Sequence, residues 1–112
     1  MKEITVTLLD EAIEFTGTLS EKQLFKLFYN IELIKSGIIS IDILKKLNSD
    51  IWEIRTVSLG AVIRVFAFWS KIEKSKLICT HGIIKKTSKV SAKEIEKAIG
   101  IMNNYYKISK HD

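Results

Sequence analysis

The chain has 112 residues, a single cysteine and no proline, which together indicate one folded domain with no internal disulfide. Apolar residues make up 46% and charged residues 28%, a composition that excludes an intrinsically disordered chain. The net charge of +5 is unevenly placed, because residues 1–60 carry −2 and residues 61–112 carry +7. A basic half predicts a local surface for a polyanion, although a solvated lysine-rich surface would give the same distribution.

Nothing in the sequence indicates export or membrane insertion. The N-terminal segment is acidic, and its apolar run is too short for a signal peptide. No stretch reaches the ~18 uncharged apolar residues of a membrane-spanning helix, and the lone Cys79 suits a reducing compartment. We therefore expect residues 1–112 to form a single cytoplasmic domain with no membrane partner.

The first third of the chain predicts a strand followed by two helices. Residues 4–9 combine β-branched side chains with partial alternation, which is typical of a short strand. Asp10 is placed to cap the short helix that follows. Ser20 and Gln23 form a capping-box pattern, and the apolar residues after them recur at the helical period. We expect the second helix over residues 20–36.

Three strand-like runs and a last helix follow. Residues 38–47 are ambiguous between helix and strand. The strand-like runs span residues 51–57, 61–69 and 75–84, and the loops between them are too short for parallel crossovers. Ser91 with Glu94 then predicts a second capping box, opening an amphipathic helix. Helices segregated from an antiparallel sheet make an α+β domain.

The chemistry-bearing side chains are cations within these strands. Side chains alternate across a strand, so Arg55 shares its face with Glu53, and Arg64 shares its face with Phe66. In the third run, alternation places His81 on one face with its neighbours Leu77, Cys79 and Ile83. If Arg55, Arg64 and His81 lie on one face, they form a cradle for a phosphodiester and a base. Lys85 and Lys86 follow directly.

Simpler interpretations stay open for each cation. Arg55 would pair with Glu53 as a surface ion pair, His81 would be an ordinary strand-end histidine, and the lysine pair would be solvated. Arg64 lies in an apolar run, where burying a cation is costly unless the cation is paired or has a function. Cys79 fits a small buried strand residue. Clustered metal ligands, a Cys–His nucleophile with an orienting group and a glycine-rich phosphate loop are not indicated, so we expect no metal and no cofactor.

Four short motifs, in order between residues 45 and 105, resemble the phage-derived branch of the RelE/HigB toxins of type II toxin–antitoxin systems. Each motif is weak alone, but the four in register are fairly specific. They are Trp52-Glu53-Ile54-Arg55, Arg64-Val65-Phe66, His81 through Thr87, and Glu94-Ile95 with Ala98.

The resemblance implies a RelE-like fold: an antiparallel sheet with two N-terminal helices packed on one face, and a C-terminal helix. It implies a metal-independent endoribonuclease, an mRNA interferase that inhibits translation. The implied partners are messenger RNA, the ribosome and a helix-turn-helix antitoxin. Two alternatives remain: a ParE-like gyrase poison, against which the presence of His81 with Arg55 and Arg64 argues, and a non-catalytic phage-derived domain that binds RNA or protein.

The resemblance also suggests roles for individual residues. Arg55 and Arg64 would hold the scissile phosphate, and His81 would transfer a proton. Lys85 or Lys86 would assist this transfer or neutralise the leaving oxygen. The other expected RNA contacts are Lys45, Lys46, Phe66 and Lys89.

Overall fold

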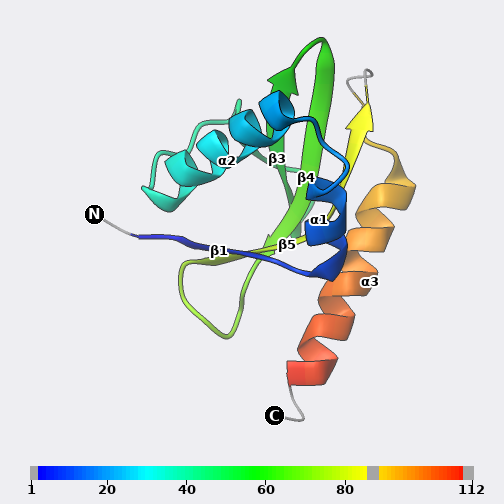
Figure 1. Ribbon diagram of the computed structural model, residues 1–112. Helices are drawn as coiled ribbons and strands as arrows, with labels where there is room; N and C mark the ends of the chain where they lie inside the picture. The colour runs from blue at the N-terminus through cyan, green and yellow to red at the C-terminus, as the bar shows by residue number, and fades with distance from the viewer. Residues whose placement is uncertain (1–2, 86–88, 110–112) are drawn as a thin grey trace.

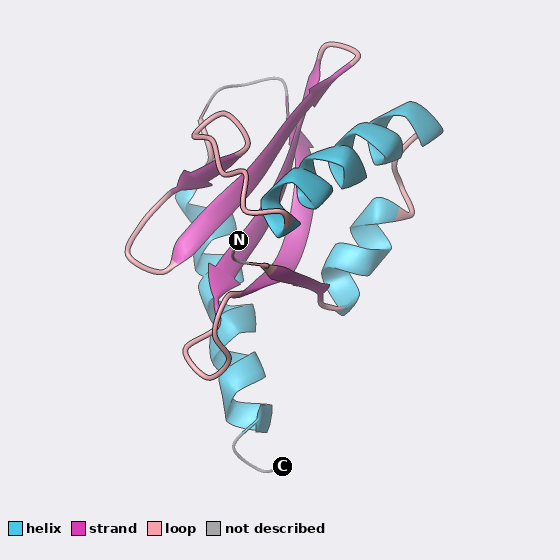
Figure 2. Ribbon diagram, turned by 90° about the vertical axis from the view of Figure 1, so that its left-hand side faces the viewer, coloured by secondary structure: helices cyan, strands magenta, loops and turns pink. Residues whose placement is uncertain are grey.

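The computed structural model of the protein describes residues 3–85 and 89–109 and contains one mixed sheet between two layers of helix (Figure 1). The five strands lie in the order β1-β5-β4-β3-β2. Figure 2 shows α3 on one side of the sheet and the other two helices on the opposite side. The elements are β1 (Thr5–Leu8), α1 (Asp10–Thr16), α2 (Glu21–Lys35), β2 (Leu44–Lys46), β3 (Ile51–Ser58), β4 (Ala61–Trp69), β5 (Lys76–Lys85) and α3 (Ala92–Ser109).

The sheet confirms the predicted α+β class and the predicted β3–β4–β5 meander. Short connections force these three strands to be antiparallel, and β2 pairs with β3 in the same sense. The expectation of a wholly antiparallel sheet is wrong at one edge, because β1 runs parallel to β5, with Thr5 beside Lys76. No hairpin loop fixes the direction of β1, which is connected to the other strands through α1 and α2.

The apolar side chains form two cores, one on each face of the sheet. The core under α1 and α2 includes Leu27, Ile34 and Val65. The core under α3 includes Phe66 and Met102. Strand β4 is thus buried on both faces, which explains why its sequence is almost continuously apolar and does not alternate with polar residues.

The sequence predicted the start of α2 correctly but not the start of α1. Ser20 and Gln23 form both bonds of the predicted capping box at the start of α2. The predicted cap of α1 is wrong, because Leu9 occupies the N-cap position and Asp10 is already the first helical residue. There its carboxylate faces the positive end of the helix dipole. Among the described residues, no helix combines the length and apolarity needed to cross a bilayer.

Candidate nucleic-acid interface

A β-bulge in β5 decides which side chains share the face of the sheet covered by α3. Phe66 pairs with His81, but the next residue of β4, Ala67, pairs with Cys79, so Thr80 is the extra residue. The prediction that Cys79 and His81 share a face is therefore wrong. Cys79 points into the core under α1 and α2, where burial raises the pKa of its thiol to about 12.

The bulge brings the predicted cations into two adjacent rows on the α3 face. Arg55 pairs with Arg64, which pairs with Ile83. In the next row Glu53 pairs with Phe66, which pairs with His81. Directly paired residues of neighbouring strands lie on the same face. The sequence expectation that Arg55, Arg64 and His81 occupy one face of the sheet thus agrees with the register.

Arg64 lies in a buried ion pair with Glu53. The guanidinium Nη1 donates to the Glu53 carboxylate Oε1, and the two side chains are only 3% and 1% exposed. This pair is the reason for a cation inside the apolar run of β4. It also contradicts the open alternative in which Arg55 pairs with Glu53. The burial of Arg64 argues against the predicted direct contact between its guanidinium and a phosphate.

His81 is also buried, and both of its ring nitrogens have partners. Nδ1 lies 3.0 Å from the Thr80 hydroxyl, and Nε2 lies 3.2 Å from a carboxylate oxygen of Glu94 in α3. The ring stacks on Phe66 with a centroid separation of 4.8 Å. Glu94 was expected to complete a capping box, but its carboxylate connects α3 to β5. With 2% of its surface exposed, His81 is out of reach of a substrate in this structure.

We expect the stability of the protein to fall on mild acidification because of His81. Burial lowers the pKa of His81 below its ordinary value of 6.5, against the opposing effect of the Glu94 hydrogen bond. Of the charged groups nearby, Lys97 also lowers this pKa and Glu11 raises it. The unfolded chain therefore takes up a proton at a higher pH than the folded protein, so stability is complete above about pH 6.5 and declines below it.

Urea unfolding of the wild type and of His81→Gln, at several values between about pH 7 and about pH 5, tests this effect. We expect the wild type to lose more stability than the variant over this range. Parallel profiles would show that His81 has the same pKa in the folded and unfolded states.

The accessible cations lie around this buried network. Arg55 and Lys85 are half-buried, and Lys45 is exposed beside Glu53 in the register. The Arg55 Nε is buried and has no hydrogen-bond partner among the residues that the structure describes. Lys89 is exposed just before α3, and Lys86 lies outside the described residues. The register places Lys45, Arg55 and Lys85 on the face that α3 covers, and we call these three together with Lys89, in the segment that leads into α3, the basic face.

Two of the expected RNA contacts lie elsewhere. Lys46 points to the opposite face of the sheet, where its Nζ lies 5.9 Å from the centre of the Trp52 ring. Phe66 is completely buried, so its ring offers no surface on which a base could stack. Sequence reasoning missed Glu53 and Glu94 as partners of Arg64 and His81. Within residues 3–85 and 89–109, no three histidine, cysteine or carboxylate side chains are grouped so that they could hold a metal ion.

Comparison with known proteins identifies the family. The model of the family described as "Phage derived protein Gp49-like (DUF891)" matches residues 14–103. The chain belongs to this family. No curated protein is significantly similar to this Gp49-like chain in sequence.

The fold of this Gp49-like chain is similar to that of the Escherichia coli toxin RelE. The solved structure is a double arginine-to-alanine mutant of RelE in the free state. The TM-score is 0.61 at 14% sequence identity, with 88% of this chain and 97% of that chain covered. The likeness confirms the predicted RelE-like fold, and the family match confirms the predicted phage-derived branch.

Proposed function

We propose that this Gp49-like protein is the toxin of a type II toxin–antitoxin pair and that it acts as a single-domain endoribonuclease on messenger RNA in the cytoplasm. The observation that carries the proposal is the basic face, with Arg55 and Lys85 half-buried on a sheet whose fold resembles that of a known toxin. Cations in that setting bind phosphate oxygens more strongly than fully solvated lysines do. The proposed partners are messenger RNA on the ribosome and a helix-turn-helix antitoxin.

The reaction that suits this face is an internal transfer at phosphorus. The RNA 2′-oxygen attacks the adjacent phosphorus and loses its proton to water, while the bond to the 5′-oxygen breaks and that oxygen gains a proton. The products are a 2′,3′-cyclic phosphate and a free 5′-hydroxyl. Arg55 binds the phosphate and offsets the extra negative charge that develops on it. Lys85, together with Lys86, donates a proton to the leaving oxygen or neutralises it.

The buried groups take a supporting role in this scheme. The Glu53–Arg64 pair connects β3 to β4 directly beside Arg55, and the His81–Glu94 contact connects β5 to α3. Both contacts fix the strands that carry the cations, so Arg64 and His81 are positioning residues. Lys45 and Lys89 bind the RNA backbone on either side.

The burial of His81 and Arg64 favours one alternative. Without an exposed histidine, the basic face would bind RNA or a protein target, such as gyrase, without cleaving anything. The exposed cations serve such binding as well as they serve catalysis.

Induced expression combined with mapping of the 5′ ends of cellular messenger RNA tests the proposal. We expect growth arrest and new cuts within reading frames. Arg55→Ala should reduce cutting roughly ten- to hundredfold, because a charge-assisted hydrogen bond contributes about 1.5–3 kcal/mol.

Lys107→Ala is the matched control, since it removes an exposed cation from the last turn of α3, away from the basic face. It should cut like the wild type. Growth arrest without new 5′ ends would show that the protein does not act by cutting messenger RNA, and would favour gyrase or another protein as its target. A folded protein that neither arrests growth nor cuts RNA would leave only the binding function.

A further inference from the structure

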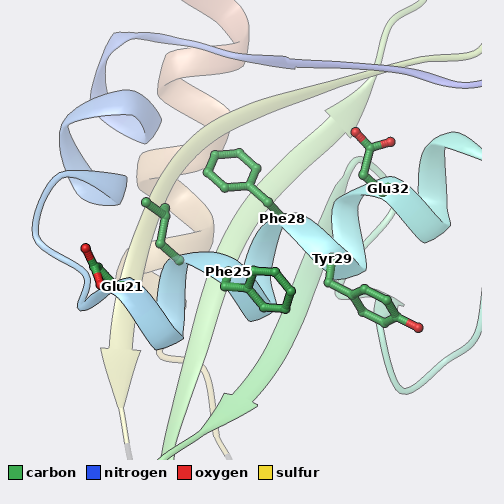
Figure 3. A pocket seen from close by; sticks show the side chains of 6 residues that line it. Glu21, Phe25, Phe28, Tyr29 and Glu32 are labelled. Atoms are coloured by element: carbon green, nitrogen blue, oxygen red, sulfur yellow. The ribbon is translucent and has the colours of Figure 1, made fainter.

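The outer face of α2 exposes a row of large apolar side chains on the side of the sheet opposite to α3. Phe25 is 75% exposed, Tyr29 58% and Phe28 40%. Figure 3 shows the three rings projecting from α2, with Glu21 near one end of the row and Glu32 toward the other. Exposed aromatic clusters of this kind mark interaction surfaces in soluble proteins.

The fold does not need this row of side chains. The opposite side of α2 supplies Leu27, Ile31 and Ile34 to the core under α1 and α2, and these three are almost completely buried. A helix that carries one apolar stripe for the core and a second stripe on its outer side has a second surface to cover. The outer stripe consists of Leu24, Phe25, Phe28 and Tyr29, and the groove along it has a volume of about 510 Å³.

The charges around the outer stripe indicate what covers it. Glu21 and Glu32 line the groove at its two ends, about 16 Å apart at 1.5 Å per helical residue. Glu32 also contacts Lys35 at 3.3 Å, but both side chains are exposed, so that pair is weak. Lys22 and Lys26 lie to one side, in an adjoining groove beside Tyr29. An occupant that runs along the stripe therefore meets a carboxylate at each end.

A second copy of this chain is a poor occupant. If two α2 helices packed antiparallel about the centre of the stripe, Glu21 of each copy would lie opposite Glu32 of the other. If they packed parallel, each glutamate would face its own counterpart. Both symmetric arrangements place like charges together at both ends of an apolar contact, which is unfavourable. A different protein with cations at these positions has no such conflict.

We propose that the outer stripe of α2 binds an amphipathic helix of a partner protein, whose apolar residues contact Phe25, Phe28 and Tyr29. The partner helix carries a lysine or arginine at each end of its apolar stripe, three helical turns apart, to pair with Glu21 and Glu32. This is the helix-in-groove mode of recognition. The bound helix lies on the face of the sheet opposite to the basic face, so it leaves the basic face open.

A designed peptide tests the proposal without any assumption about ribonuclease activity. The probe is a labelled helical peptide of about 18 residues, with a leucine stripe and two lysines three turns apart. The control peptide has glutamates in place of those two lysines. Fluorescence anisotropy should give at least a tenfold lower Kd for the lysine peptide on the wild type. On the Glu21→Lys/Glu32→Lys variant, we expect the order to reverse, with the glutamate peptide binding more tightly than the lysine peptide.

Phe25→Ser completes the test, because this ring is mostly solvent-exposed and its loss should leave the circular dichroism spectrum unchanged. The variant should bind the lysine peptide at least tenfold more weakly, and its effect on growth should match the wild type. Equal binding of the two peptides, or no binding of either, would overturn the proposal. A wild-type dimer in sedimentation experiments that becomes monomeric in Phe25→Ser would also overturn it in favour of a second copy.

Discussion

Replacing Glu53 with alanine is expected to lower the free energy of unfolding by about 3–5 kcal/mol, the usual cost of removing one partner from a buried ion pair. Both side chains of the Glu53–Arg64 pair are almost fully buried. The variant retains the Arg64 guanidinium in the interior but deletes the carboxylate that offsets its charge. Because small domains are stable by only about 5–15 kcal/mol, a loss of this size removes a large part of the free energy of unfolding. Urea titration followed by circular dichroism measures the change.

Two controls separate burial from charge in this experiment. Glu11→Ala breaks the Glu11–Lys97 pair, which has a distance of 2.8 Å but is about half exposed, and should cost less than about 1 kcal/mol. Glu53→Leu combined with Arg64→Met removes both buried charges and should recover most of the loss. If Glu53→Ala cost no more than Glu11→Ala, the account of a buried pair would be wrong. For the same reason, Arg64→Ala is a poor probe of RNA cleavage, because it removes the other member of the pair.

Gly82→Ala is expected to destabilise the protein by about 3 kcal/mol, at the upper end of the range for overpacking. Gly82 follows His81 in β5, and its missing side chain leaves room for a ring from α1. A Cβ atom at this position would lie 2.2 Å from Cδ2 and 2.7 Å from Cγ of Phe15. Because the clash includes Cγ, the ring atom bonded to Cβ, the Phe15 side chain has to leave its site. A shift in the urea midpoint with an unchanged slope would measure the cost.

Gly100→Ala is the matched control for this substitution. A Cβ atom at Gly100 meets nothing within 4 Å, and the residue is exposed within α3. Alanine should stabilise the helix there by up to about 1 kcal/mol. In the Gly82→Ala background, Phe15→Ala should cost less than it does in the wild type, because the clash has gone. Additive effects of Phe15→Ala and Gly82→Ala would contradict the proposed clash.

Local signals in the sequence were sufficient for most of the fold. The capping box at Ser20 and the apolar period after it predicted α2 closely. Short loops predicted the antiparallel pairing of β3, β4 and β5. The resemblance to the RelE/HigB family predicted that the two N-terminal helices pack on one face of the sheet. The direction of β1 was not predictable in this way, because two helices and three strands separate it from its partner β5 in the chain.

The candidate site was less predictable, because burial and partners depend on residues far apart in the sequence. Alternation predicted which neighbours share a face with Arg55 and with Arg64 within each strand, but it did not fix the register between the strands. No local pattern indicates the extra residue Thr80, which turns His81 to the face of Arg55 and Arg64. The exposure of a strand residue depends on the helix above it. Phe66 was therefore expected to contact RNA, whereas it lies in the core under α3. A signal for the Glu53 pairing did exist, since an apolar strand that contains a cation needs a carboxylate nearby.

The parallel pairing of β1 with β5 also determines when the protein can fold during its synthesis. Thr5 leaves the ribosome early, yet its partner Lys76 belongs to the last third of the chain. Chains grow by roughly 5–20 residues per second, and domains fold as units once their parts are present. The helix that holds His81 in place, α3, is made later still. The basic face is therefore completed only after Lys89 and α3 have left the ribosome, so a growing chain cannot present it while the strands of the sheet are still being made.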